Sequence, residues 1–279
     1  MARVIFATLL LLAPATLAEE TPEASAQDQG QLQAMVGATW DSRYIWRGFD
    51  VFDGKSALHV LADLNLFDTG FGVSAVGHQN LAESFGDYQR WDGTAYYQNG
   101  LLDGERLAVN FRVGYVYYYY PKTNSGRTQD LMEGHLILSW PNLLPIQGLQ
   151  PSYVFVYMLP GMSNPWAEIE DPDFDDNSTG MFHMLMLDYG LTVPAFIPSM
   201  DDQTIRLHSE LVYNGGVSPF GTEVKSGLSD AVLGVSTDFA FGSERNLVLT
   251  PSVYYQWSLE RTVNPDNEFW VSIGLKYVF

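Results

Sequence analysis

The chain has 279 residues, of which 46% are hydrophobic and 14% aromatic, with a mean hydropathy of −0.06. The formal charge of −19 argues against nucleic acid as a partner, because phosphate binding needs a basic surface. The absence of cysteine excludes disulfide bridges and cysteine-ligated metals.

The N-terminus predicts export. One arginine is followed by an apolar run over residues 4–13 and by small residues up to Ala18, which is typical of a cleaved secretory signal peptide over residues 1–18. Ala26 ends an alternative cleavage site. We expect residues 19–33 to be a disordered lead-in and residues 34–279 to form the folded domain. No later window offers the roughly 18 apolar residues of a membrane helix, so a membrane form of this chain has to be a closed barrel.

Period-two alternation of apolar and polar residues dominates the rest of the chain, and helical periodicity is almost absent. About twelve such runs occur, each near the roughly 9–11 residues that a tilted strand needs to cross a bilayer. An even number of strands places both ends of the domain on the periplasmic side. The predicted strands are 34–46, 56–67, 71–79, 88–98, 106–119, 129–140, 150–159, 180–191, 203–213, 229–241, 246–257 and 268–279.

A secreted β-sandwich produces the same alternation, so other features are needed to favour a barrel. Aromatic residues cluster at the strand ends, where outer-membrane barrels carry interfacial girdles. Short turns alternate with longer acidic loops, of which 160–178 is the longest. The last strand has apolar alternate residues and ends with Tyr277 and Phe279, which resembles the closing strand of bacterial outer-membrane proteins. The resemblance implies recognition by the barrel-assembly machinery. Together these features favour an all-β, antiparallel transmembrane barrel of about twelve strands in the bacterial outer membrane.

Residues 36–77 add a narrower resemblance. Arg43-Tyr44-Ile45-Trp46-Arg47-Gly48 contains a Tyr-x-x-Arg-Gly pattern preceded by Ser42, and an amphipathic hairpin follows. This region resembles the start of the TorF-like porin family. The resemblance covers about the first quarter of the mature chain, and it implies a small porin-like barrel without naming a solute.

The polar phase of the strands carries charges of both signs. Opposed charges of this kind select ions in porins, but they also form a paired plug in a barrel too narrow to conduct. Arg43 and Arg47 have the same two readings: they attract anions at the mouth, or they are salt-bridged at a strand end. The predicted pore-lining residues are Arg43, Asp63, Arg90, Asp92, Arg106, Arg112, Glu133, Arg206, His208, Glu210 and Asp238.

Other chemistry is weakly indicated. Asp171, Asp173 and Asp175 are weak candidate metal ligands, but Asp176 takes the glycine position that a calcium-binding EF-hand loop requires. Most of the five histidines lie on the polar phase, where some approach one another across the lumen. His208 and Ser209 are adjacent in a strand and therefore point to opposite faces, which disfavours a hydrolase. The sequence predicts no cofactor and no enzyme.

The sequence thus favours a porin-like channel for passive diffusion of small hydrophilic solutes, with loop 160–178 as a constriction or lid. The alternative is a non-conducting barrel with a structural, adhesive or sensing role through its acidic loops. The expected partners are outer-membrane lipid and lipopolysaccharide, the barrel-assembly machinery and the solutes.

Overall fold

A computed structural model describes residues 32–82, 89–121, 130–161, 178–197, 202–242 and 244–279. The predicted signal peptide, the candidate metal ligands Asp171, Asp173 and Asp175, and most of loop 160–178 lie outside these residues. In the part of the chain that the structure describes, no helix is long and apolar enough to cross a membrane. The described helical structure is one 3₁₀ turn, η1 (Phe67–Thr69).

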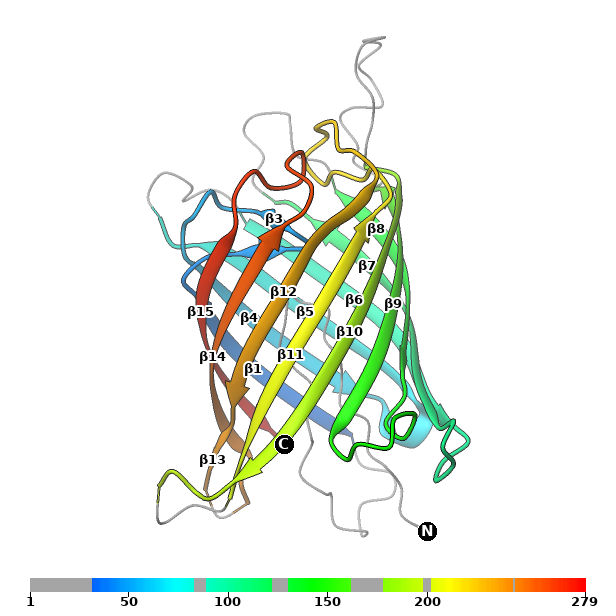
Figure 1. The fold of residues 1–279 in the computed structure, drawn as a ribbon, viewed down its shortest axis with the longest axis vertical. Coiled ribbons are helices and arrows are strands. Elements are labelled where there is room, and N and C mark those ends of the chain that lie inside the picture. The colour runs from blue at the N-terminus through cyan, green and yellow to red at the C-terminus, as the bar shows by residue number, and fades with distance from the viewer. Residues whose placement is uncertain (1–31, 83–88, 122–129, 162–177, 198–201, 243) are drawn as a thin grey trace.

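Antiparallel strands close into a barrel of twelve (Figure 1). Neighbours in the chain pair in order, β15 pairs with β1, and β12 pairs with β14. The short strand β13 (Phe239–Phe241) continues β12 beyond a break at Asp238 and also pairs with β14. The wall strands are β1 (Gln33–Asp41), β4 (Ala57–Asn65), β5 (Phe71–Asn80), β6 (Gln89–Leu101), β7 (Val109–Tyr119), β8 (Leu131–Ser139), β9 (Leu149–Pro160), β10 (Gly180–Val193), β11 (Gln203–Asn214), β12 (Gly227–Thr237), β14 (Leu247–Ser258) and β15 (Glu268–Val278).

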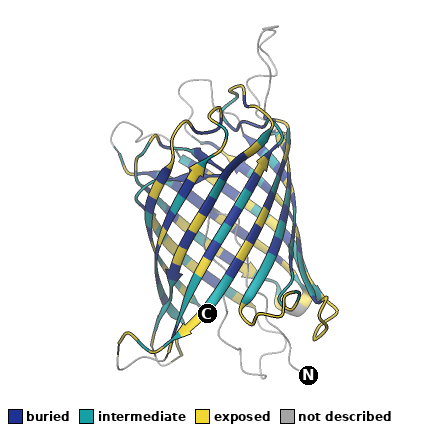
Figure 2. Ribbon diagram, in the orientation of Figure 1, coloured by how far each residue is buried: buried dark blue, intermediate teal, exposed yellow. Residues whose placement is uncertain are grey.

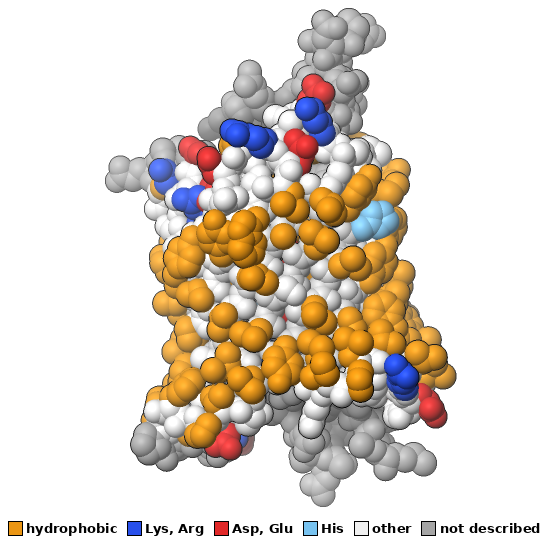
Figure 3. All heavy atoms as spheres, in the orientation of Figure 1, with side chains coloured by type: hydrophobic (Ala, Val, Ile, Leu, Met, Phe, Trp, Pro, Cys, Tyr) orange, Lys and Arg blue, Asp and Glu red, His pale blue; other side chains and the backbone are white. Residues whose placement is uncertain are grey.

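Alternation along each strand separates two environments (Figure 2). In β15, Phe269, Ile273 and Leu275 are exposed on the outside, whereas Trp270 and Ser272 are buried toward the lumen. Figure 3 shows the result on one face of the barrel: hydrophobic side chains are spread over the wall, and charged groups gather at the two ends. Such a continuous apolar surface is stable in lipid and not in water.

Exposed aromatic residues mark both ends of this apolar surface, as the sequence predicts. The two ends are called the loop end, where the chain passes from β1 to β4, and the termini end, where β1 begins and β15 ends. Exposed aromatics at the loop end include Trp40, Trp91, Tyr119, Tyr157, Tyr213, Trp257 and Phe269, and those at the termini end include Phe67, Phe71, Phe196, Phe241, Tyr277 and Phe279.

The strand predictions are correct in number and order, but three boundaries are wrong by three residues or more. The strand predicted to end at residue 98 continues to Leu101. The first strand ends at Asp41 and does not reach residue 46, because residues 42–56 turn into the barrel. The strand predicted from residue 106 begins at Val109. Arg106 therefore lies in an exposed turn, where its Nε donates to the Leu143 carbonyl oxygen at 3.3 Å, and it does not line the lumen as predicted.

Candidate functional site

The inward segment, residues 42–56, is the most distinctive feature of the lumen. Asp41 and Ala57 pair directly across β1 and β4, so the wall is continuous without this segment. Within it, β2 (Ile45–Trp46) and β3 (Phe49–Asp50) form a small hairpin. The two residues at its tip, Arg47 and Gly48, both have positive φ angles, of 50° and 89°, as tight hairpin turns favour.

Apolar packing holds the inward segment in the loop-end half of the lumen. Tyr44, Trp46, Phe49 and Phe52 are each at most 3% exposed. They join one cluster with inward side chains of the β7–β11 wall, and each contributes about 1.5–3 kcal/mol of burial free energy. Ile45 packs separately with the inward Val232, Tyr254 and Trp270. The wall members of the first cluster are Val116, Tyr118, Leu131, Ile137, Val154, Val156, Met158, Phe182, Met184, Met186 and Val212.

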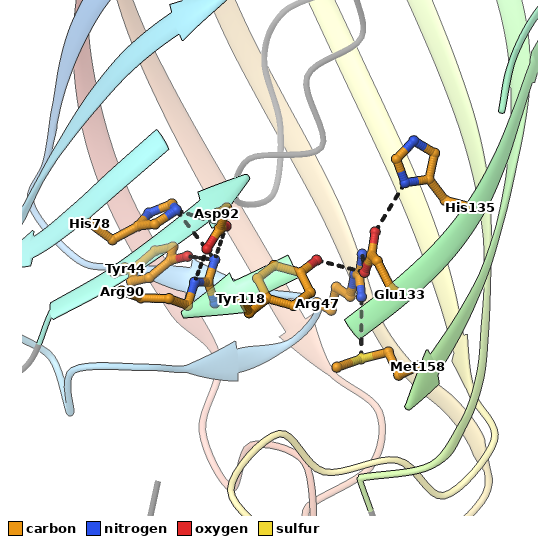
Figure 4. Close-up of polar contacts among 9 residues, drawn as sticks. All are labelled: Tyr44, Arg47, His78, Arg90, Asp92, Tyr118, Glu133, His135 and Met158. Carbon is orange, nitrogen blue, oxygen red and sulfur yellow. Dashed lines mark hydrogen bonds and ion pairs between the residues drawn. The ribbon is translucent and has the colours of Figure 1, made fainter. Parts of the chain in front are cut away.

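Arg47 anchors the tip of the inward segment to the far wall (Figure 4). Its Nη2 lies 2.7 Å from Oε2 of Glu133 on β8, and its Nη1 lies 3.5 Å from the Met158 sulfur. Glu133 also accepts a 2.6 Å hydrogen bond from the Tyr118 hydroxyl and lies 3.2 Å from Nδ1 of His135. Burial alone would lower the pKa of Arg47, but the Glu133 carboxylate more than offsets this and keeps the guanidinium charged.

A second network holds Tyr44 against the near wall (Figure 4). Nη2 of Arg90 on β6 donates to the Tyr44 hydroxyl at 2.7 Å and to Asp92 Oδ2 at 2.8 Å. Asp92 Oδ2 also lies 3.0 Å from Nε2 of His78, whose ring stacks on Tyr44 with 5.3 Å between centroids. Burial raises the pKa of Tyr44, so its hydroxyl stays protonated.

The backbone of the inward segment is fixed as well. The Gln256 side chain on β14 donates to the Gly48 carbonyl oxygen at 2.9 Å. A Cβ at Gly48 would lie 2.5 Å from Oδ1 of Asp230 on β12, so a larger residue would have to shift the turn. At the loop end, Arg43 forms an ion pair with Glu268 and lies 3.7 Å from Asp50. The segment thus reaches side chains from both sides of the barrel.

The termini-end half of the lumen is polar. Tyr96 donates to Asp63 at 3.0 Å, and its ring lies 3.9 Å from the Arg112 guanidinium. On the opposite wall, Arg206 lies 2.5 Å from Asp238. These pairs combine charges of both signs, as the strand pattern predicts.

The structure places the predicted pore-lining residues in three groups. Arg43 belongs to the inward segment itself, and Arg90, Asp92 and Glu133 lie beside that segment. Those on the inner wall elsewhere are Asp63, Arg112, Arg206, His208, Glu210 and Asp238. Arg106 is outside the wall, as described above.

Sequence reasoning missed Tyr44, Trp46 and Phe52 as lumen residues. The available signal was composition: residues 44–52 are rich in aromatic and aliphatic side chains, which a water-exposed loop does not need. For Arg47, the structure agrees with the salt-bridged reading over a free anion-attracting group. Among the described residues, no group of three or more histidine, aspartate or glutamate side chains is arranged to hold a metal ion.

Comparisons with known proteins support the fold. No family model matches the sequence, and no curated protein does. The "COG4313 outer membrane channel from Pseudomonas putida F1" is 12% identical, with a TM-score of 0.51 over 92% of this chain and all of that one. The "KdgM porin" is 11% identical (TM-score 0.47, 88% and 99% of the two chains), and "LpxR from Salmonella typhimurium" is 8% identical (0.46, 88% and 100%). The chain therefore has the fold of a bacterial outer-membrane β-barrel, which supports a place in the outer membrane.

Proposed function

We propose that this protein is an outer-membrane channel for passive diffusion of small hydrophilic solutes, with the inward segment as its constriction. The observation that carries the proposal is the division of the lumen. Polar side chains with charges of both signs line the termini-end half, and the buried segment 42–56 occupies the loop-end half. The TorF-like resemblance of residues 36–77, which include this segment, supports the same proposal.

The polar half has the character of a water-filled passage. Asn65, Asn110 and Lys276 face the lumen there and remain partly exposed. Inward groups of this kind solvate ions and small polar molecules, whereas a lumen built only for rigidity would be filled. Both ring nitrogens of His208 face carboxylates in this lumen, with Asp188 at 2.6 Å from Nδ1 and Glu210 at 3.9 Å from Nε2.

Shortening the inward segment tests the proposal. Since Asp41 and Ala57 already face each other, replacing residues 43–55 by a tight turn leaves the β1–β4 pairing intact. Single-channel conductance in planar bilayers is expected to rise severalfold over the intact protein. A matched control shortens the exposed turn 102–107 between β6 and β7 and leaves conductance unchanged. Absence of current from the shortened, correctly folded barrel would overturn the channel proposal.

One observation favours the alternative, a non-conducting barrel with a structural, adhesive or sensing role. The inward segment packs through almost fully buried aromatic rings, which seals better than the polar loop of an open pore. The same recordings separate the two. A silent wild type with a conducting shortened variant means a closed channel, and two silent proteins mean a non-conducting barrel.

The partners proposed for this role are outer-membrane lipid with lipopolysaccharide around the apolar wall, and the barrel-assembly machinery at the closing strand. Tyr277 and Phe279 lie on the outer face of that strand with ring centroids 4.8 Å apart. The Phe279 backbone N–H donates to the Ala34 carbonyl oxygen at 2.9 Å, next to the β1–β15 seam. An assembly factor that reads these two rings would therefore hold the edge that closes the barrel.

A further inference from the structure

Two buried histidines contact each other beneath the inward segment. Nδ1 of His59 on β4 lies 2.7 Å from Nδ1 of His78 on β5. The outer nitrogen of each ring faces a carboxylate: His59 Nε2 lies 3.0 Å from Asp41 Oδ2, and His78 Nε2 lies 3.0 Å from Asp92 Oδ2. The result is a continuous row, Asp41–His59–His78–Asp92, across the four wall strands β1, β4, β5 and β6.

This geometry restricts the protons on the two rings. An ionised carboxylate accepts hydrogen bonds and cannot donate them, so His78 Nε2, which is hydrogen-bonded to Asp92, carries a hydrogen. A hydrogen on His59 Nε2 likewise suits its 3.0 Å ion-pair contact with Asp41. Arg90 Nη2 also lies 3.4 Å from His78 Nε2, but Asp92 is nearer and takes the stronger contact. Between the two Nδ1 atoms one hydrogen makes an N–H···N bond. Two hydrogens, or none, would set like groups against each other at 2.7 Å.

The charges around the row balance with one shared proton. Two carboxylates carry −2, the ring pair with its single shared proton carries +1, and Arg90 carries +1. All of these residues are at most 7% exposed, so an uncompensated charge among them is costly. Other described groups near the row are hydroxyls. Ser272 donates to Asp41, and the Tyr44 hydroxyl accepts from Arg90. The phenols of Tyr118 and Tyr120 lie near Arg90, and that of Tyr254 lies near Asp41.

We propose that His59 and His78 share one proton, and that this proton keeps the inward segment seated in the lumen. Tyr44 is the connection, since its ring lies against both imidazoles, with centroids 4.7 Å from His59 and 5.3 Å from His78. A second proton makes both rings cationic beside Arg90 and breaks the N–H···N bond. The rings separate, Tyr44 loses its support, and acid pH releases the segment. The effect on conduction rests on the proposed function, but the proton sharing and the movement do not.

The shared proton is tested directly by nuclear magnetic resonance of the folded protein with ¹⁵N-labelled histidine in detergent micelles. At neutral pH we expect a coupling between the two Nδ1 atoms through the hydrogen bond and hydrogens on both Nε2 atoms. The signals are assigned with His59→Gln and His78→Gln variants. Two neutral rings without such a coupling would overturn the proposal, and this measurement uses the wild-type protein.

The release is tested by distance measurements between spin labels. The chain has no cysteine, so Asp53→Cys in the inward segment and Glu105→Cys in the opposite turn, both exposed positions, give a unique labelled pair. Acidification from about pH 8 to about pH 4, the range around ordinary histidine titration, should shift the label distance in the wild type.

Two histidine variants complete the test. The His59→Gln/His78→Gln background should lose the pH-dependent shift, whereas His183→Gln, whose ring contacts Tyr153 away from this row, should keep it. If the distance between the spin labels does not change at a pH where nuclear magnetic resonance shows both rings cationic, the shared proton does not hold the inward segment in place. None of these measurements needs current, so a non-conducting barrel would disprove the channel and leave this inference standing.

Discussion

Replacing Arg47 by methionine removes the charge that Glu133 faces and keeps most of the side chain's volume. Arg47 is 5% exposed and the Glu133 side chain 0%, so the variant leaves a buried carboxylate without its cation. Removing one partner of a buried ion pair costs about 3–5 kcal/mol. Tyr118 and His135 still contact the carboxylate, at 2.6 and 3.2 Å. We therefore expect Arg47→Met to lower the free energy of unfolding by about 3 kcal/mol, the lower end of that range.

The ion pair itself is isolated by a double-mutant cycle with Glu133→Gln. The combined variant should be less destabilised than the sum of the two single variants, by about 2 kcal/mol. The assay is equilibrium denaturant unfolding in phospholipid vesicles, followed by tryptophan emission. Arg106→Met, at an exposed arginine outside the wall, is the matched control and should stay within about 0.5 kcal/mol of wild type. A loss below about 1 kcal/mol for Arg47→Met, with additive energies in the cycle, would refute an anchoring role for this pair.

Three further predictions use the same folded protein. Gly48→Ala should lower the free energy of unfolding by more than about 1 kcal/mol, because the position has positive φ and its Cβ would strike a wall carboxylate. It should also loosen the inward segment, as seen in spin-label spectra. Gly104→Ala, at a position with similar φ and open space, should lower the free energy of unfolding less and leave the segment in place. Leu233→Arg, in the middle of the outer face of β12, should destabilise the vesicle-embedded barrel by about 2–4 kcal/mol, and Leu228→Arg, near the end of that strand, by about 0–1 kcal/mol. Equal losses of stability in unfolding titrations would argue against Leu233 lying deeper in the bilayer than Leu228. In a conducting form, Arg112→Glu should shift the reversal potential toward cation selectivity, and an unchanged potential would remove this residue from the passage.

The wall could be predicted because its pattern is local. Each strand residue faces either lipid or lumen, so a period of two reveals the whole sheet, and runs such as 203–213 on β11 matched to within a residue. Alternation does not predict which charges pair across strands, since the register of two strands cannot be read from one strand alone. The break at Asp238 and the late start of β7 lay in turn geometry that alternation does not encode.

The inward segment could not be predicted in the same way because its partners are distant in sequence. Arg47 and Glu133 are 86 residues apart, and Gly48 and Gln256 are 208 apart. No periodic pattern connects them. The apolar composition of this loop between two strands indicated only that its side chains are buried. That they are buried inside the lumen is seen only in the closed barrel, where the strand walls surround the loop. The row of Asp41, His59, His78 and Asp92 likewise depends on strand register, which the closed sheet supplies.

The attachment of the inward segment has a consequence for the order of assembly. Its polar contacts include residues on β6, β8, β9, β14 and β15, so these distant anchors do not exist while only the first strands have formed. The seam between β1 and β15 joins the two ends of the domain, and contacts of such sequence separation form slowly. The hairpin of residues 45–50 therefore forms its final contacts only after the sheet has closed into a barrel. A segment near the start of the chain is thus among the last to reach its place.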